Sequence, residues 1–420
     1  MAEPSDTTRP GAVAAATAAA AQTSPQRPAG MLPLLIVGQI ALHGAMAGQR
    51  LAAPLQALQA GYSAWAVGVL LALFAALPVL TALGAGRMAD RHGYHRPVRV
   101  AVGFTMTGAA CALAACWLPG GWQFGLNCVG AAASGVGTNL GLIAIQRSAS
   151  QMVSTSTERL RVFSWLGMAP SLANVVGPVT AGFMIDAAGY ASAYALLMAM
   201  PLLSLAVARR VPVLARPPAA APREPGRSRW DLLATPGMRR LLFVNWLLSA
   251  SWDVHSFAVP VLGHARGYSA STIGLVLGTF TAAVTAVRFV IPLLAHRLRE
   301  VTVLRVAMLL TGLVFSLYPF AATPWLMGTC ALLLGLTLGA VQPMIMSTLH
   351  HLTPAHRHGE AIAFRSMAIN FSSSMMPLAF GLAGTALGPG MLFWLMGAAV
   401  GGGSWAARGL QSVFVVKQPV

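Results

Sequence analysis

The sequence has few charged residues and almost no lysine. Only 9% of its 420 residues are charged, with 10 acidic against 27 basic side chains, whereas about 25% of the residues of an ordinary soluble protein are charged. So few charged groups cannot cover the surface of a soluble protein of this length. This scarcity argues strongly against a soluble enzyme.

Motifs of common enzyme classes are absent as well. The sequence has no phosphate-binding G-x-x-x-x-G-K-[ST] loop, no G-x-S-x-G nucleophile motif and no H-E-x-x-H zinc motif. A cluster of histidines at 350–358 lacks acidic and cysteine partners, which favours an interfacial basic patch over a metal site. We therefore expect no enzyme activity, no cofactor and no bound metal. The four cysteines lie in apolar stretches without metal-ligand spacing, and we expect no disulfide.

Apolar residues dominate what remains, with 56% hydrophobic residues and a mean hydropathy of +0.68. A helix needs about 20 mostly apolar residues to cross a bilayer. Twelve such stretches lie between clusters of charge and Gly or Pro punctuation. Their approximate boundaries are 31–58, 65–86, 97–118, 122–146, 160–186, 190–208, 239–263, 270–295, 303–321, 325–349, 361–386 and 389–407.

These stretches predict an all-α membrane protein with two halves. A proline-rich, polar segment separates the first six spans from the last six and is typical of a linker. The predicted organisation is a disordered cytoplasmic tail (1–30), a six-helix bundle (31–208), a cytoplasmic linker (209–238), a second six-helix bundle (239–407) and a cytoplasmic tail (408–420).

The basic residues indicate the orientation of these helices. All but three of the 27 lie in or beside the linker, the tails and the turns after even-numbered spans; the exceptions are Arg50, Arg266 and Arg288. By the positive-inside rule both termini are then cytoplasmic. The net charge of +17 is thereby explained by topology, and we expect no nucleic-acid partner.

An internal repeat supports the division into halves. The sequence Gly-Tyr-Ser-Ala at 61–64 recurs at 267–270, and the same offset of 206 relates Gly68 to Gly274 and Phe74 to Phe280. Pro178 and Gly182 match Pro377 and Gly381 at an offset of 199. Duplicated halves that rock about a central site are expected of secondary transporters.

The segment after the second span carries a specific motif. Residues 86–96 read GRMADRHGYHR, which resembles the G-x-x-x-D-R-x-G-x-x-R signature of the major facilitator superfamily. The resemblance extends over about residues 31–407 and implies twelve transmembrane helices in two pseudo-symmetric six-helix bundles. It also implies a cytoplasmic gate formed with the eleventh helix, for which the candidates are Gly86, Asp90, Arg91, Gly93, Arg96, Arg288 and Arg365.

Within this gate, Gly86 is expected to permit close helix packing and Gly93 a turn with positive φ. Arg365 is the expected partner of Asp90. In the fifth span Gly177, Pro178 and Gly182 resemble a signature of the superfamily's exporters, although a packing kink without directional meaning explains them nearly as well.

Asp253 is the one carboxylate well inside a span, and charges there are functional candidates by default. A proton-coupling or outer-gate role for Asp253 with Arg50 is one interpretation, and a permanent salt bridge between the two is the other. In the superfamily, helices 1, 4, 7 and 10 line the cavity. The candidates for the substrate cavity are accordingly His43, Gln49, Asn139, Trp252, His255 and Gln342, with interhelical hydrogen bonds as the alternative for each amide.

The leading functional hypothesis is a secondary transporter that works by alternating access and exports a small amphipathic compound against proton entry. One alternative is proton-coupled uptake of a small organic anion, because arginines outnumber Asp253 among the charges inside the spans. A non-transporting membrane sensor or assembly platform is the alternative from another class. We expect a monomer in the bacterial inner membrane, whose partners are a small-molecule substrate, protons and the lipid bilayer.

Overall fold

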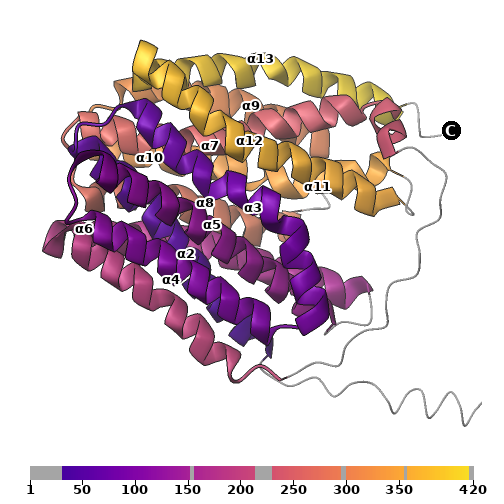
Figure 1. The fold of residues 1–420 in the computed structure, drawn as a ribbon. Coiled ribbons are helices and arrows are strands. Elements are labelled where there is room, and N and C mark those ends of the chain that lie inside the picture. Colours follow the sequence, from indigo (N-terminus) through magenta and orange to yellow (C-terminus); the bar gives the residue numbers. More distant parts are fainter. Residues whose placement is uncertain (1–30, 152–155, 213–228, 295–298, 354–356, 416–420) are drawn as a thin grey trace, which may run out of the picture.

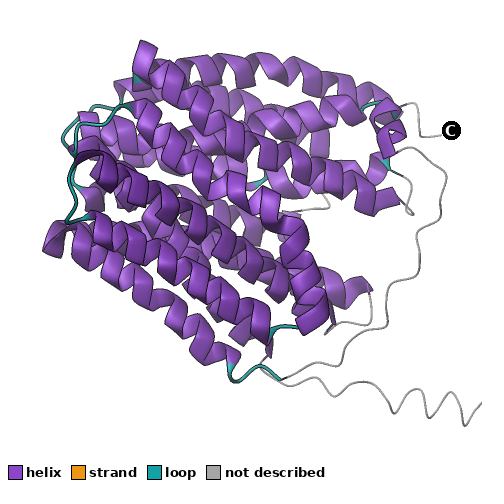
Figure 2. Ribbon diagram, in the orientation of Figure 1, coloured by secondary structure: helices purple, strands orange, loops and turns teal. Residues whose placement is uncertain are grey.

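The computed structural model describes residues 31–151, 156–212, 229–294, 299–353 and 357–415 (Figure 1). These residues are almost entirely helical, and no β-strand occurs among them (Figure 2). The expected N-terminal tail and most of the expected linker lie outside this part of the chain.

The helices follow from the apolar composition, because backbone N–H and C=O groups in lipid must be satisfied within their own segment. Eight helical segments of the described residues are long and apolar enough to cross a membrane. The helices are α2 (Met31–Gln59), α3 (Ala64–His92), α4 (His95–Ala115), α5 (Gly120–Gln151), α6 (Ser156–Ala208), α7 (Met238–Ala265), α8 (Ala270–Leu294), α9 (Glu300–Leu317), α10 (Pro324–Gly339), α11 (Val341–Leu352), α12 (His358–Leu387) and α13 (Pro389–Val415), with the short 3₁₀ helices η1 (Arg229–Ala234) and η3 (Tyr318–Phe320).

Two helices depart from the expected spans. The label α6 covers two spans that meet at a kink at Gly189, where φ is 79° and ψ is 176°. One expected span is instead divided into α10 and α11 at Ala340, because Pro343 has no N–H to donate to the carbonyl of Gly339. With α6 counted as two and α10–α11 as one, the described residues trace twelve segments. α13 continues to Val415, beyond the boundary expected at 407.

The segments form two bundles with the same internal packing. In the first bundle α3 packs on α5, and α4 on the second half of α6; in the second bundle α8 packs on α10, and α9 on α13. A Cβ at Gly135 would overlap the carbonyl of Phe74, and a Cβ at Gly335 that of Phe280. The repeat seen in the sequence thus places equivalent glycine contacts in both bundles.

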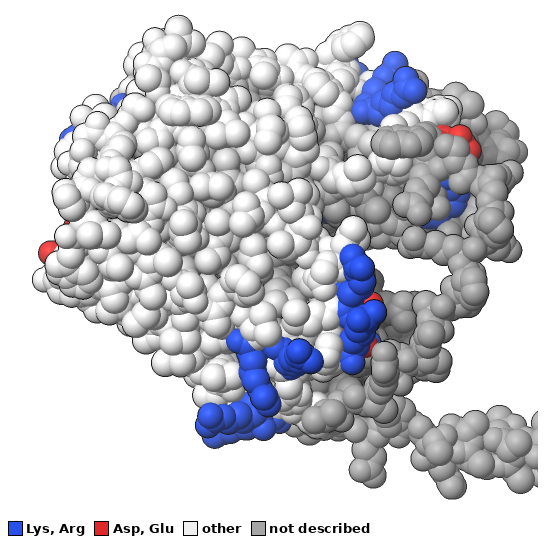
Figure 3. Space-filling model, in the orientation of Figure 1, with Lys and Arg blue, Asp and Glu red and all other residues white. Residues whose placement is uncertain are grey.

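The charged side chains are concentrated at one end of the molecule. Figure 3 shows a broad face almost free of charge, with most of the Lys and Arg visible in this view gathered toward one end. We call this end the linker face; it includes the end of α3 and the start of α7. The end with the turns before Ala64 and Ala270 is called the opposite face. An apolar belt between charged ends is the pattern of a multi-pass membrane protein.

The glycine contacts lead to a prediction about stability. Gly135→Val would drive a side chain into the backbone of α3, so we expect a loss of about 1–3 kcal/mol, as for other overpacked cores. Gly103→Val is the matched control, because a Cβ there meets nothing within 4 Å. Thermal unfolding of both variants in detergent checks this, and an equal loss in both would contradict the proposed role of the contact.

Candidate functional site

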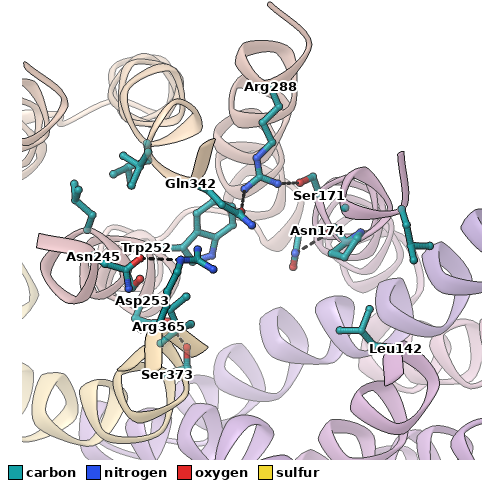
Figure 4. Close-up of a pocket in the computed structure, with 18 of the residues that line it drawn as sticks. Leu142, Ser171, Asn174, Asn245, Trp252, Asp253, Arg288, Gln342, Arg365 and Ser373 are labelled. Carbon is teal, nitrogen blue, oxygen red and sulfur yellow. Dashed lines mark hydrogen bonds between the residues drawn. The ribbon is translucent and has the colours of Figure 1, made fainter. Parts of the chain in front are cut away.

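A cavity of about 610 Å³ lies between the two bundles. It reaches from the middle of the molecule toward the linker face, where Figure 3 shows the surface hollowed between the bundles. Its polar and charged lining residues are Arg50, Gln146, Ser171, Asn174, Asn245, Ser249, Trp252, Asp253, Arg288, Gln342, Arg365 and Ser373 (Figure 4). Three arginines face one carboxylate, so the cavity carries an excess of positive charge.

Arg50 and Asp253 both line this cavity but do not form the ion pair that the sequence suggested as one alternative. The carboxylate of Asp253 instead accepts hydrogen bonds from Ser372 Oγ at 2.8 Å and Ser373 Oγ at 3.3 Å, both on α12. Arg50 donates no hydrogen bond to any residue in the described part of the chain, and it also lines a smaller hollow of about 40 Å³ toward the opposite face. Its guanidinium is thus available to a ligand.

Arg288 connects the two bundles across the cavity. Its Nη1 donates to Ser171 Oγ on α6 at 2.7 Å, and its Nη2 donates to Gln342 Oε1 on α11 at 2.9 Å. Figure 4 shows the guanidinium between these two partners. Arg288 therefore lies in the cavity itself while also linking elements that must separate or approach when the cavity changes shape.

The expected pairing of Asp90 with Arg365 was wrong for this conformation. Asp90 accepts a hydrogen bond from Arg147 Nε on α5 at 2.7 Å, within its own bundle. Arg365 donates to Asn245 Oδ1 at 3.2 Å inside the second bundle. The open cavity holds the linker ends of α3 and α12 apart, so each charge finds a partner in its own bundle.

The other residues of the expected gate lie at the end of α3 and the turn that follows it. Gly93 has a φ of 65°, as the turn requires. Gly86 does not mediate the expected close packing, because a Cβ there would meet nothing within 4 Å. Arg91 is exposed, and Arg96 Nη1 lies 2.6 Å from His92 Nε2.

Of the six candidates for the substrate cavity, Trp252 and Gln342 line it and the other four do not. Gln49 accepts from Ser134 Oγ at 2.8 Å, and Asn139 donates to the carbonyl of Pro78 at 3.3 Å. These two amides make the interhelical hydrogen bonds that were the alternative interpretation.

Both histidine candidates also lie outside the cavity lining. His255 is fully buried in the second bundle, with Nε2 2.8 Å from the hydroxyl of Tyr318. His43 lies one layer behind the cavity, with Nε2 3.4 Å from Nδ2 of Asn174, which does line it. His43 is therefore placed to orient Asn174.

Sequence reasoning missed the polar residues contributed by the fifth and eleventh spans. Ser171 and Asn174 come from α6, and Ser372 and Ser373 from α12. A signal was present, since each pair precedes a proline, Pro178 or Pro377, by four to seven residues in an otherwise apolar span.

The glycine–proline motif expected in the fifth span lies on α6 and packs this helix against its neighbours. A Cβ at Gly177 would come within 2.7 Å of the backbone N of Gly48 on α2, and one at Gly182 within 2.9 Å of the backbone of Ala270 on α8. The carbonyl of Pro178 faces Gly274, where a Cβ would lie 2.5 Å from it. The motif therefore helps to close the opposite face.

Two side chains cap helix starts across the same closed face. Asp186 on α6 accepts from the backbone N–H of Ala270 at 3.0 Å and of Ser271 at 2.8 Å, at the first turn of α8. Thr385 on α12 accepts from the backbone N–H of Trp65 at 3.1 Å, at the first turn of α3. Offsets of 199 and 206 relate these partners, so the two contacts are equivalent. We call them the Asp186 cap and the Thr385 cap.

Twelve helical segments in two equivalent bundles, with a polar cavity between them that is closed at one end, define a membrane transporter rather than an enzyme. The Major Facilitator Superfamily model matches residues 35–240 and 241–411. The chain belongs to this superfamily.

Solved structures confirm the fold. The chain is similar to a POT family transporter in complex with a thioalcohol-conjugated peptide (TM-score 0.73, 12% identity, covering 94% of this chain and 99% of that one). It is also similar to a POT family transporter in complex with 5-aminolevulinic acid (TM-score 0.69, 12% identity, covering 94% of this chain and 98% of that one). A third similar structure is the peptide transporter POT in complex with sulfate (TM-score 0.73, 15% identity, covering 94% of this chain and 97% of that one). At this identity the likeness shows the fold alone. The comparison with curated proteins gives no match.

The unequal caps lead to a prediction about conformation. Asp186→Ala removes a charged acceptor from a helix start, a change worth about 1 kcal/mol or about fivefold in an equilibrium. We expect the opposite face to open about fivefold more often, and Thr385→Val to have a smaller effect.

The measurement is the modification rate of Ser256→Cys, which lies in the small hollow below this face, in a variant without native cysteines. A membrane-impermeant thiol reagent is applied from the opposite face. Asp186→Asn, which keeps one acceptor oxygen, is the control. A rate unchanged by Asp186→Ala would contradict the cap's role.

Proposed function

We propose that this protein is a proton-coupled secondary transporter of a small organic anion with an apolar part. The observation that carries the proposal is the guanidinium of Arg50, which faces the cavity and has no hydrogen-bond partner among the described residues. Arg50 is partly exposed to the open cavity, where its guanidinium can donate charge-assisted hydrogen bonds to an anionic group of a substrate.

The rest of the lining supports an anionic, partly apolar substrate. Arg288 and Arg365 add positive charge, and Asn174 and Asn245 add amide groups. Leucine, valine and isoleucine side chains and the ring of Trp252 cover much of the remaining wall. A volume of about 610 Å³ falls in the range usual for small-molecule sites.

Asp253 is the proposed proton site. It lies in the same cavity as Arg50, so its negative charge competes with a substrate anion for the positive field there. Protonation of Asp253 removes that competition, and the proton and the anion therefore bind more favourably together than apart. Joint binding favours symport, which under an inward proton gradient results in uptake.

Alternating access requires both ends of the cavity to open in turn. In the described conformation the linker face is open and the two caps hold the opposite face. We propose that the linker face is cytoplasmic, as its positive charge suggests, and that a single chain, which encloses the whole cavity, is the functional unit in the bacterial inner membrane.

Export of an amphipathic compound stays a prediction. It rests on the glycine–proline motif of α6, whose residues pack against α2 and α8 and carry no information about direction. The sensor or platform hypothesis has no feature of the cavity in its favour, and substrate-driven proton movement in vesicles would exclude it.

Asp253→Asn tests the coupling. The amide keeps an oxygen to accept from Ser372 but cannot take up a proton near neutral pH. We expect substrate exchange between equal concentrations to continue and accumulation driven by a pH gradient to be lost. Substrate flux is measured in proteoliposomes, once with equal substrate concentrations on both sides and once with a pH gradient. Asp231→Asn on exposed η1 is the control. Accumulation that persists in Asp253→Asn would exclude Asp253 as the proton site.

Arg50→Gln tests the substrate class. Loss of a charged hydrogen bond of about 1.5–3 kcal/mol corresponds to about 10- to 150-fold weaker binding. A thermal-shift screen of small carboxylates on the purified protein identifies a ligand, whose affinity is then measured for Arg50→Gln. Arg87→Gln, at the exposed end of α3, is the control. A set of ligands that are cations, or that bind Arg50→Gln equally well, would overturn the assignment.

A further inference from the structure

A second hollow of about 510 Å³ lies on the outside of the second bundle, away from the cavity. It runs between α7 and α13, with one residue of α12 at its edge. Phe243 and Trp405 are among the residues that line it and are 45% and 75% exposed. The hollow therefore opens on the side of the molecule that faces the bilayer. We call it the α7–α13 groove.

Glycines on α13 create the groove. At Gly403 a Cβ would overlap the side chain of Leu247, so the two helices are in close contact there. At Gly402 a Cβ would meet nothing within 4 Å. The missing side chain at Gly402, beside the large rings of Trp246 and Trp405, leaves an apolar channel on the surface.

The length of the groove fits one leaflet of a bilayer. On α7 the residues Arg239, Phe243, Trp246 and Ala250 follow one another on one face, at steps of three or four. The lining residues of α13 run from Met396 to Ala406, over which a helix rises about 15 Å at 1.5 Å per residue. This is half of a hydrocarbon core of about 30 Å, so the groove runs from the linker face to about the middle of the membrane.

Arginines surround the end of the groove at the linker face. Arg240 Nη1 donates to the carbonyl of Gly409 at 2.9 Å and so joins α7 to α13 there. Arg239 and Arg408 are exposed; Arg239 Nε donates to the carbonyl of Leu233 at 3.0 Å, and its two terminal NH₂ groups make no hydrogen bond among the described residues. No ion pair links these three to a carboxylate within the described ranges. At this depth the side chains meet the headgroups of one leaflet, where each basic residue attracts anionic lipid.

The ring of Trp246 adds to the apolar wall of the groove. Its Nε1 is buried within the protein and has no hydrogen-bond partner among the described residues. The part of Trp246 that meets the groove is therefore apolar and suits an acyl chain.

We propose that the α7–α13 groove binds a phospholipid with an anionic headgroup from the leaflet at the linker face. One acyl chain lies along Gly402 and the ring of Trp246, and the phosphate lies near Arg239 and Arg408. A second copy of the chain fits the groove less well, because a twofold contact would bring the same arginines of both copies together.

The test uses full-length protein in nanodiscs with equal amounts of phosphatidylglycerol and phosphatidylcholine of the same acyl chains. Native mass spectrometry after release counts the phospholipids that each variant retains. We expect wild-type protein to retain phosphatidylglycerol preferentially. Arg239→Gln and Arg408→Gln should each lower that preference about fivefold, the effect of one basic residue at an anionic surface.

Gly402→Leu should fill the groove and abolish retention of both lipids. The control, Gly103→Leu on α4, places the same side chain at another exposed glycine whose Cβ would meet nothing within 4 Å, and should behave as wild type. Equal retention of the two lipids, or retention unaffected by Gly402→Leu, would overturn the proposal, as would dimers that cross-link through a cysteine at Trp405.

Discussion

The first turn of a helix leaves backbone N–H groups without partners in that helix, and the closed end of this molecule depends on how two such turns are satisfied. At the opposite face the starts of α3 and α8 receive acceptors from the other bundle, from Thr385 and Asp186. Glycines and the carbonyls of Pro178 and Pro377 allow the close approach that these contacts need. Closure of one end leaves the cavity to open at the other.

The number of spans and the duplication were predicted from the sequence because both depend on quantities that a sequence carries directly, the length of apolar stretches and the spacing of glycine and proline. The direction in which individual side chains point from their helices was predicted less well. Gln49 and His255 lie on the expected helices but point into the bundles, because hydropathy does not fix the rotation of a helix that is apolar all round. The partner of Asp90 depends on conformation, which the sequence of α3 does not specify.

Asp186 shows a further limit of sequence reasoning. Its place next to Gly189 suggests a residue of a turn, and its importance arises only because the first turn of α8 lies against it in three dimensions. The repeat contained this information in part, since the offsets that relate Pro178 to Pro377 and Gly68 to Gly274 also relate Asp186 to Thr385 and Ser271 to Trp65. Comparison of contacts under the repeat therefore finds functional pairs that inspection of single residues does not.

The arginines of the cavity differ in whether they are hydrogen-bonded to protein groups. Arg288 and Arg365 donate hydrogen bonds to protein groups, so they shape the cavity and maintain its positive field. Arg50 makes no such bond in the described part of the chain and remains open to a ligand, next to the region that the caps close. A ligand bound at Arg50, as proposed above, would lie next to the elements whose separation opens the opposite face.

The inequality of the two caps has a consequence for the energetic cost of opening the opposite face. A carboxylate with two N–H donors holds the contact of α6 with α8, whereas a hydroxyl with one donor holds the contact of α3 with α12. The contact between α6 and α8 therefore contributes the larger share of the energetic cost of opening this face. The two halves of the repeat are equivalent in position but unequal in the free energy with which they keep this end closed.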